Sequence, residues 1–165
     1  MCNCLCKPKI SKFEQQLVGK TLYGEITDVL DGATLLIDIQ YGDTLYTLKS
    51  VLYKCERFSY NYITKKDGYL TRRNSKKSNP LISYDCSNSD YYSKTTNMFV
   101  SLLKNAHYFS LELVDLNKIN KELKQEPIRC YLNVIGFSND HYIISLYHST
   151  NLSKSVNDLM LERIF

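Results

Sequence analysis

Residues 29–36 read VLDGATLL and place an Asp-Gly pair between two apolar stretches. Such a pair predicts a β-hairpin, because Asp31 and Gly32 both tolerate the positive φ that a type I′ turn requires. Residues 34–40 then alternate, with Leu and Ile side chains on one face and mostly polar side chains on the other. We therefore expect a hairpin that leads into a half-buried strand.

Further strand-like runs lie on both sides of this hairpin. A turn at residues 41–43 connects the second strand to a third, which gives a meander of three short strands. We interpret the polar stretch over residues 117–126 as a connection. Besides residues 34–40, the expected strands cover residues 20–30, 44–53, 108–116, 129–137 and 141–148.

Two segments have the apolar spacing of amphipathic helices. Residues 93–106 place Phe99, Leu102 and Leu103 on one face, so we expect that face to pack against the strands. Residues 155–164 begin with a serine that is followed three positions later by an aspartate, which resembles the capping box at a helix start. The sequence thus predicts one helix in the middle of the fold and one at its end.

The order of these elements is that of an OB-fold, a small Greek-key barrel with helices packed on it. We expect an α+β, mostly β fold, namely a five-stranded OB-fold-type barrel with two or three packed helices and a long basic insertion. The 165 residues, 44% of them hydrophobic, suffice for one domain with a core. We assign residues 1–19 to a cysteine-containing tail and residues 20–165 to the barrel domain, with a surface insertion at 57–92.

From the sequence we expect no transmembrane segment and no signal peptide. No apolar run approaches the roughly 18–20 residues that a membrane helix needs, and the N-terminus lacks the apolar centre of a signal peptide. We expect a soluble, intracellular protein, and the sequence does not identify its compartment.

Three of the six cysteines, Cys2, Cys4 and Cys6, lie close together at the N-terminus. Their spacing lacks the paired C-x-x-C of ordinary zinc sites. The alternatives are free thiols on a mobile tail, a zinc site with a distant fourth ligand, and sites for acylation. We favour the free thiols, and the role of the cluster stays open.

Two short motifs resemble those of the thermonuclease (micrococcal-nuclease-like) family. LDGATLLI at residues 30–37 is similar to the family's apolar-Asp-Gly-Asp-Thr hairpin. SVNDLML at residues 155–161 is similar to its terminal helix, which follows a short hairpin and carries an (L/V)N-x-x-(L/M) pattern. The resemblance spans residues 20–163 if the insertion and longer connections at 117–126 and 137–148 are allowed.

The resemblance implies a calcium-dependent phosphodiesterase site in active members of the family. Two aspartates hold the cation, a glutamate activates the attacking water, and two arginines bind the phosphate. In this sequence Ala33 takes the place of the first aspartate and Tyr53 that of the second. Glu56 matches the general base, and Arg129 matches one phosphate-binding arginine.

The rest of the implied site is missing. The other arginine position falls on Leu48, or on Lys49 if the alignment slips by one residue, and lysine cannot form the bidentate clamp. Asp31 and Asp38 lie nearby as weak candidates for substitute metal ligands, although a turn residue and an exposed strand residue are the simpler readings. Glu56 and Arg129 are then remnants of a catalytic site, or an ordinary surface acid and base.

We therefore expect a degenerate thermonuclease-like protein without calcium-dependent nuclease activity and without a cofactor. Such a pseudoenzyme would act as a nucleic-acid-binding module, with single-stranded nucleic acid as the ligand, or as a protein-interaction module. The alternative is an active, divergent, metal-dependent phosphodiesterase (a nuclease) in which Asp31, Asp38 and Glu56 form a rearranged calcium site.

The insertion at residues 57–92 carries six cations within residues 65–77, where Asp67 is the only acid, and tyrosines lie among and beside them. Such a loop can neutralise phosphates, and tyrosines can stack on unpaired bases. The net charge of +4 is too small to indicate a polyanionic partner by itself, so the clustering carries the argument. The alternative is an ordinary solvated insertion. The candidate nucleic-acid-binding residues are Lys65, Lys66, Arg72, Arg73, Lys76 and Lys77.

Replacing these six cations with serine should weaken binding to single-stranded oligonucleotides and flatten its salt dependence. Log affinity falls with log salt by about 0.7 for each phosphate contacted on a single strand. Fluorescence anisotropy titrations over a salt series measure this slope, and Arg129→Ala should change it only slightly, since one exposed charge gains little against salt. Unchanged binding by the serine variant would show a solvated loop, and a parent that does not bind would favour the protein-interaction module.

Overall fold

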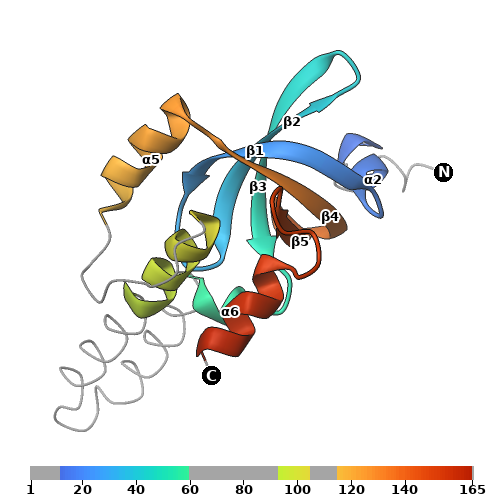
Figure 1. The fold of residues 1–165 in the computed structure, drawn as a ribbon. Helices are drawn as coiled ribbons and strands as arrows, with labels where there is room; N and C mark the ends of the chain where they lie inside the picture. The colour runs from blue at the N-terminus through green and yellow to red at the C-terminus, as the bar shows by residue number, and fades with distance from the viewer. Residues whose placement is uncertain (1–11, 60–92, 105–114, 165) are drawn as a thin grey trace, which may run out of the picture.

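Five strands close into a barrel in the order β1-β2-β3-β5-β4 (Figure 1). The computed structural model describes residues 12–59, 93–104 and 115–164. This strand order, with β3 and β5 parallel and the other neighbours antiparallel, confirms the predicted OB-fold-type α+β barrel. The strands are β1 (Thr21–Val29), β2 (Thr34–Tyr41), β3 (Thr44–Leu52), β4 (Ile128–Ser138) and β5 (His141–His148).

Helices surround the barrel at its ends and along one side (Figure 1). A short helix, α2 (Lys12–Leu17), precedes β1, and a 3-10 turn, η1 (Glu56–Phe58), follows β3. The central helix covers residues 93–103 in the described chain. Two more helices, α5 (Leu116–Gln125) and α6 (Val156–Ile164), precede β4 and follow β5. Among the helices in the described ranges, none has the length and apolar character needed to cross a membrane.

The barrel interior is filled by alternate residues of the strands, as the period-two pattern predicts. Leu35 and Ile37 of β2 are fully buried, and Ile39 is 1% exposed. On the predicted face of helix 93–103, Phe99 and Leu103 are buried in the same hydrophobic cluster. The predicted packing of this helix against the barrel is therefore confirmed.

The hairpin at Asp31-Gly32 is present, but the type I′ turn was wrong. Among the described residues, positive φ occurs in non-glycine residues only at Lys54, Asn139 and Asp140, and Gly32 is not among the positive-φ glycines. The Asp31 carboxylate instead accepts hydrogen bonds from the backbone N–H groups of Ala33 (2.9 Å) and Thr34 (2.8 Å). Aspartate stabilises turns in this way without left-handed backbone.

Glycine is needed at position 32 because helix 93–103 approaches the hairpin closely. A Cβ atom on Gly32 would lie 2.8 Å from the Thr95 hydroxyl oxygen and 2.9 Å from the Thr95 Cβ.

The two consecutive positive φ angles of a type I′ turn occur instead in the β4–β5 hairpin, at Asn139 (52°) and Asp140 (69°).

The polar stretch that we expected to be a connection forms α5. Asp115 caps this helix, since its carboxylate accepts hydrogen bonds from the N–H groups of Asn117 and Lys118. Of the strand expected over residues 108–116, residues 108–114 lie outside the described chain. The last two residues were assigned wrongly, because Asp115 and Leu116 begin the helix.

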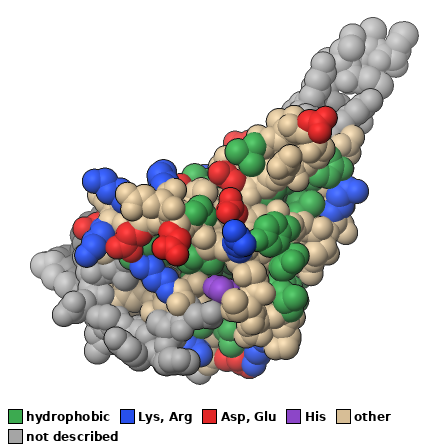
Figure 2. Space-filling view, turned by 45° about the horizontal axis from the view of Figure 1, so that its top comes forward, with side chains coloured by type: hydrophobic (Ala, Val, Ile, Leu, Met, Phe, Trp, Pro, Cys, Tyr) green, Lys and Arg blue, Asp and Glu red, His purple; other side chains and the backbone are tan. Residues whose placement is uncertain are grey.

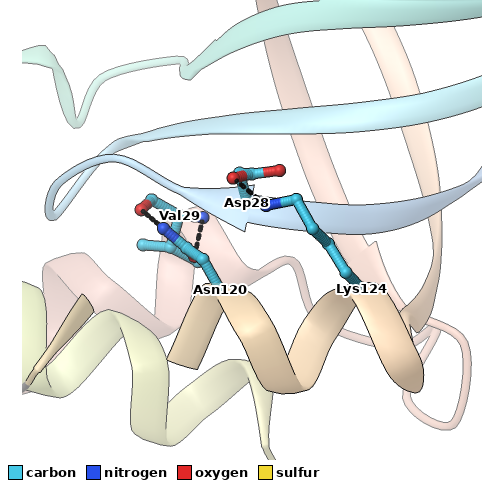
Figure 3. A network of polar contacts seen from close by, with 4 residues as sticks. All are labelled: Asp28, Val29, Asn120 and Lys124. Carbon is cyan, nitrogen blue, oxygen red and sulfur yellow. Dashed lines mark hydrogen bonds and ion pairs between the residues drawn. The ribbon is translucent and has the colours of Figure 1, made fainter. Parts of the chain in front are cut away.

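Helix α5 docks on β1 through the side chain of Asn120, which bonds to the backbone of β1 (Figure 3). The Asn120 side chain accepts from the Val29 N–H (2.8 Å) and donates to the Val29 carbonyl (3.1 Å), as a neighbouring strand would. Beside it, the Lys124 ammonium lies 2.8 Å from the Asp28 carboxylate. Since β4 pairs with β1 only as far as Ile26, these contacts continue the pairing at the end of β1.

Helix α6 is held to the barrel by Asn157, which is 4% exposed. Its amide nitrogen donates to the carbonyls of Tyr53 and Ile144, each at 3.0 Å, and its amide oxygen accepts from the Leu146 N–H at 2.9 Å. The predicted cap is confirmed, because the Asp158 N–H donates to the Ser155 hydroxyl at 3.0 Å.

Asn157→Ala should lower the free energy of unfolding by about 2–4 kcal/mol. It removes the partner of three backbone groups, and each buried unsatisfied group costs about 1–3 kcal/mol before relaxation or water entry. Urea denaturation followed by circular dichroism measures the change. Asn117→Ala, at an exposed position of α5, should stay within about 0.5 kcal/mol. Equal stabilities of the two variants would contradict the role of Asn157.

Candidate functional site

The two expected catalytic remnants lie on separate elements. Glu56 is half-buried at the start of η1, directly after β3, whereas Arg129 is exposed on β4. Arg129 lines a surface pocket with residues of β1, α5 and β5, and Glu56 is not among the lining residues. The described contacts therefore do not bring the pair together.

Apolar residues occupy two of the other positions that the resemblance implies. Ala33 is fully buried and Leu48 is 2% exposed, so both side chains belong to the core. Lys49 is exposed, on the opposite face of β3 from Leu48. A carboxylate at position 33 would lose its hydration, which is costly without a compensating partner.

The weak metal candidates Asp31 and Asp38 lie apart. Asp31 bonds to the first residue of β2, Thr34, and Asp38 follows Thr34 by four residues in the same strand. At roughly 3.3 Å per strand residue, the backbone of Asp38 lies about 13 Å along β2 from Thr34, the residue to which the Asp31 carboxylate bonds. The Asp38 carboxylate accepts a hydrogen bond from the Thr47 hydroxyl at 2.6 Å. Within the described ranges, no three His, Cys, Asp or Glu side chains are grouped as metal ligands would be.

Three tyrosines form a row across the outer face of β1, β4 and β5. Tyr23 pairs with Tyr131 in the β1–β4 ladder, and Tyr131 pairs with Tyr147 in the β4–β5 ladder. The rings of Tyr23 and Tyr131 meet edge to face, with centroids 5.1 Å apart. Tyr23 is 45% exposed, and the other two are half-buried. We call this set the tyrosine row.

A polar row runs along each side of the tyrosine row. On one side the Thr21 hydroxyl donates to the Asn133 side chain at 2.6 Å. On the other side Glu25 of β1 lies opposite Arg129 of β4, and the Ser149 N–H donates to the Arg129 carbonyl. The tyrosines therefore lie on a three-strand surface with hydrogen-bonding groups on both sides.

A pocket of about 410 Å³ lies at the Glu25–Arg129 end of this surface. The end of α5, the start of β4 and the end of β5 form its walls, and its lining includes Glu25, Gln125, Glu126, Pro127, Arg129 and His148. Figure 2 shows a face on which a surface histidine has charged side chains of both signs on one side and hydrophobic side chains on the other.

The opposite charges in this pocket are not neutralised by each other. Glu25 and Arg129 are cross-strand partners, yet the ion pairs among the described residues do not include one between them. Glu25 is half-buried and Arg129 is exposed. A carboxylate acceptor and a guanidinium donor thus lie side by side at the pocket.

The ring of His148 is held by hydrogen bonds at the pocket wall. Its Nδ1 accepts from the Thr150 N–H at 3.1 Å, and its ring also hydrogen-bonds to the backbone of Leu103. Burial lowers the pKa of His148 below its usual value of about 6.5, and the Leu103 contact opposes part of this shift. The ring therefore connects the end of β5 to helix 93–103.

The other candidate residues cannot be placed in the same way. The six cations of the insertion and the cysteines Cys2, Cys4 and Cys6 lie outside the described residues. Two further cysteines, Cys55 and Cys130, are buried free thiols, and burial raises the pKa of each to about 12, which makes them poor nucleophiles.

Comparison of the chain with protein-family models, curated proteins and solved structures found no match.

Sequence reasoning missed the tyrosine row and Glu25. Each tyrosine occupies an outward position of a strand that alternates apolar residues, and this signal was readable from the sequence. Their alignment into one row depends on the register between β1, β4 and β5, which three separate strand patterns do not contain. The neighbouring Glu25 and Arg129 were hidden for the same reason.

Lowering the pH below about 6.5 should destabilise the protein through His148. Its folded pKa is lowered, so the unfolded state binds the proton first, and the stability present above pH 6.5 is lost as the pH falls toward the folded pKa. Urea unfolding at pH 7.5 and pH 5.5 measures the loss, which should be smaller in His148→Gln than in the parent. His141→Gln is the control, and if it has the same effect, the assignment to His148 is wrong.

Proposed function

We propose that this chain is a binding module that holds single-stranded nucleic acid on the outer face of β1, β4 and β5. The observation that carries the proposal is the tyrosine row, a line of aromatic rings on the outside of an OB-fold-type barrel. Bases of a single strand stack on such rings whatever their identity, because every base has a π face.

The arrangement of the row supports binding in addition to its contribution to sheet stability. Cross-strand aromatic pairs alone stabilise a sheet by about 0.2–1 kcal/mol, which explains one pair. Here a third ring extends the row to β5, and polar side chains border it on both sides. A strand lying along the row would meet rings in its middle and hydrogen-bonding groups at its edges.

Binding is favoured over metal-dependent cleavage by the positions of the carboxylates. The alternative enzyme needs Asp31, Asp38 and Glu56 around one cation, but Asp31 lies in the turn before β2 and Asp38 lies in the middle of that strand. The Asp31 carboxylate also bonds to two backbone N–H groups of its own turn. The cations of the insertion remain predicted contacts for phosphates of the same strand.

Tyr23→Ala should weaken binding of a single-stranded oligonucleotide by about 5- to 150-fold. Base–aromatic stacking contributes roughly 1–3 kcal/mol per base, and this substitution removes the most exposed ring of the row. Fluorescence anisotropy measures the affinity. Tyr23→Phe keeps the ring and should bind as the parent does.

Tyr53→Ala is the matched control, since Tyr53 is 41% exposed, follows β3 and is not part of the tyrosine row. Equal affinities of Tyr23→Ala and the parent, with both variants folded, would show that the row is not the binding face. Incubation of the parent with calcium tests the rival function, and cleavage that Glu56→Gln abolishes would identify a nuclease.

A further inference from the structure

The pocket beside the tyrosine row offers a specific set of hydrogen-bonding groups to a bound strand. Glu25 and Arg129 each lie two positions along their strands from a tyrosine of the row, and Ser149 follows Tyr147 by two residues, just after the end of β5. The pocket therefore opens on the same face, one row further along. A strand whose bases stack on the tyrosines would place its next nucleotide at the pocket.

The charge of the pocket favours a base over a phosphate. The lining residues include two acids, Glu25 and Glu126, and one arginine, Arg129, while burial lowers the pKa of His148 and so disfavours a positive charge on its ring. A phosphate would meet more negative than positive charge there. A neutral base gains hydrogen bonds from both kinds of group without this repulsion.

We propose that this pocket binds guanine, an inference that rests on the proposed function. A carboxylate only accepts hydrogen bonds and a guanidinium only donates them. Guanine presents the N1–H and N2–H donors next to the O6 and N7 acceptors, so its edge can contact Glu25 and Arg129 together. Arginine paired with O6 and N7 is also a common guanine contact in DNA recognition.

The other bases satisfy this pair less well. Adenine and cytosine each carry one exocyclic amino group, and thymine and uracil carry one ring N–H, so none offers the carboxylate two adjacent donors from separate atoms. Glu25 and Arg129 face each other across neighbouring strands, where opposed Cβ atoms lie about 4.5–5.5 Å apart. Their side chains can therefore reach neighbouring positions on one base.

The walls of the pocket suit a flat ring. Pro127 and His148 are among the lining residues, and the His148 ring is held by its contacts to Thr150 and Leu103. The pocket is open to solvent, and its volume of about 410 Å³ leaves room for one base against the sheet.

The test compares oligothymidylates of one length that carry a single G, A, C or T at a central position. Fluorescence anisotropy with the full chain should show binding of the G oligonucleotide at least about tenfold tighter than that of the T oligonucleotide, since a bidentate contact discriminates between bases by this order. In Glu25→Gln the ratio should fall to about one, with binding of the T oligonucleotide retained.

Asp38→Asn is the matched control, because Asp38 lies opposite Glu25 on β2 but outside the pocket lining. It removes the same charge and should keep the preference for G. Equal binding of all four oligonucleotides by the parent would overturn the guanine site and leave the proposed function standing. A preference for G that survives in a folded Glu25→Gln would also overturn it, and absence of binding to any oligonucleotide would overturn both proposals.

Discussion

The barrel depends on the three hydrogen bonds of Asn157 at the place where its ladder is weakest. β3 and β5 are the only parallel neighbours among the described strands, and only Ser50–Leu52 of β3 pair with β5. Beyond Leu52 the Asn157 side chain bonds both to Tyr53, which follows β3, and to Ile144 and Leu146 of β5. A side chain of α6 thus satisfies backbone groups at the end of the ladder that closes the barrel, which an apolar residue at position 157 could not do.

Asn120 likewise fixes a helix, α5, to the barrel through side-chain hydrogen bonds to backbone groups. It pairs with both backbone groups of Val29 and so fixes α5 against β1. The end of α5 then supplies Gln125 and Glu126 to the pocket, while β1 supplies Glu25. The shape of the proposed guanine site is therefore set by an amide–backbone contact that lies outside it.

The strands of the barrel, their inward faces and the turn at residues 41–43 were predictable from the sequence, whereas the geometry of the Asp31-Gly32 turn and the contacts between elements were not. The alternation of Leu35, Ile37 and Ile39 defines the core side of β2 without further information. The type I′ turn assigned to Asp31-Gly32 was wrong, because the glycine there makes room for Thr95 and does not provide a positive φ. Thr95 lies more than sixty residues away in the sequence. Helix α5 was readable from its cap and its Leu116, Ile119 and Leu123 spacing, but its polar composition concealed it.

The core pattern and the candidate binding face are parts of one constraint. A shift of one residue in any ladder turns every side chain of a strand to the opposite face. The buried residues Cys130 and Leu132 of β4 therefore fix Tyr131 on the outside, and Leu146 of β5 does the same for Tyr147. The buried side chains thus fix the strand register, and the register alone keeps the three tyrosines aligned. Substitution of a tyrosine can therefore change binding while the core maintains the fold. Ala33 and Leu48 are buried in the core, so these two positions of the implied nuclease site cannot contact a ligand. On the proposed function, the residues that bind the ligand lie instead on the outer face of the barrel.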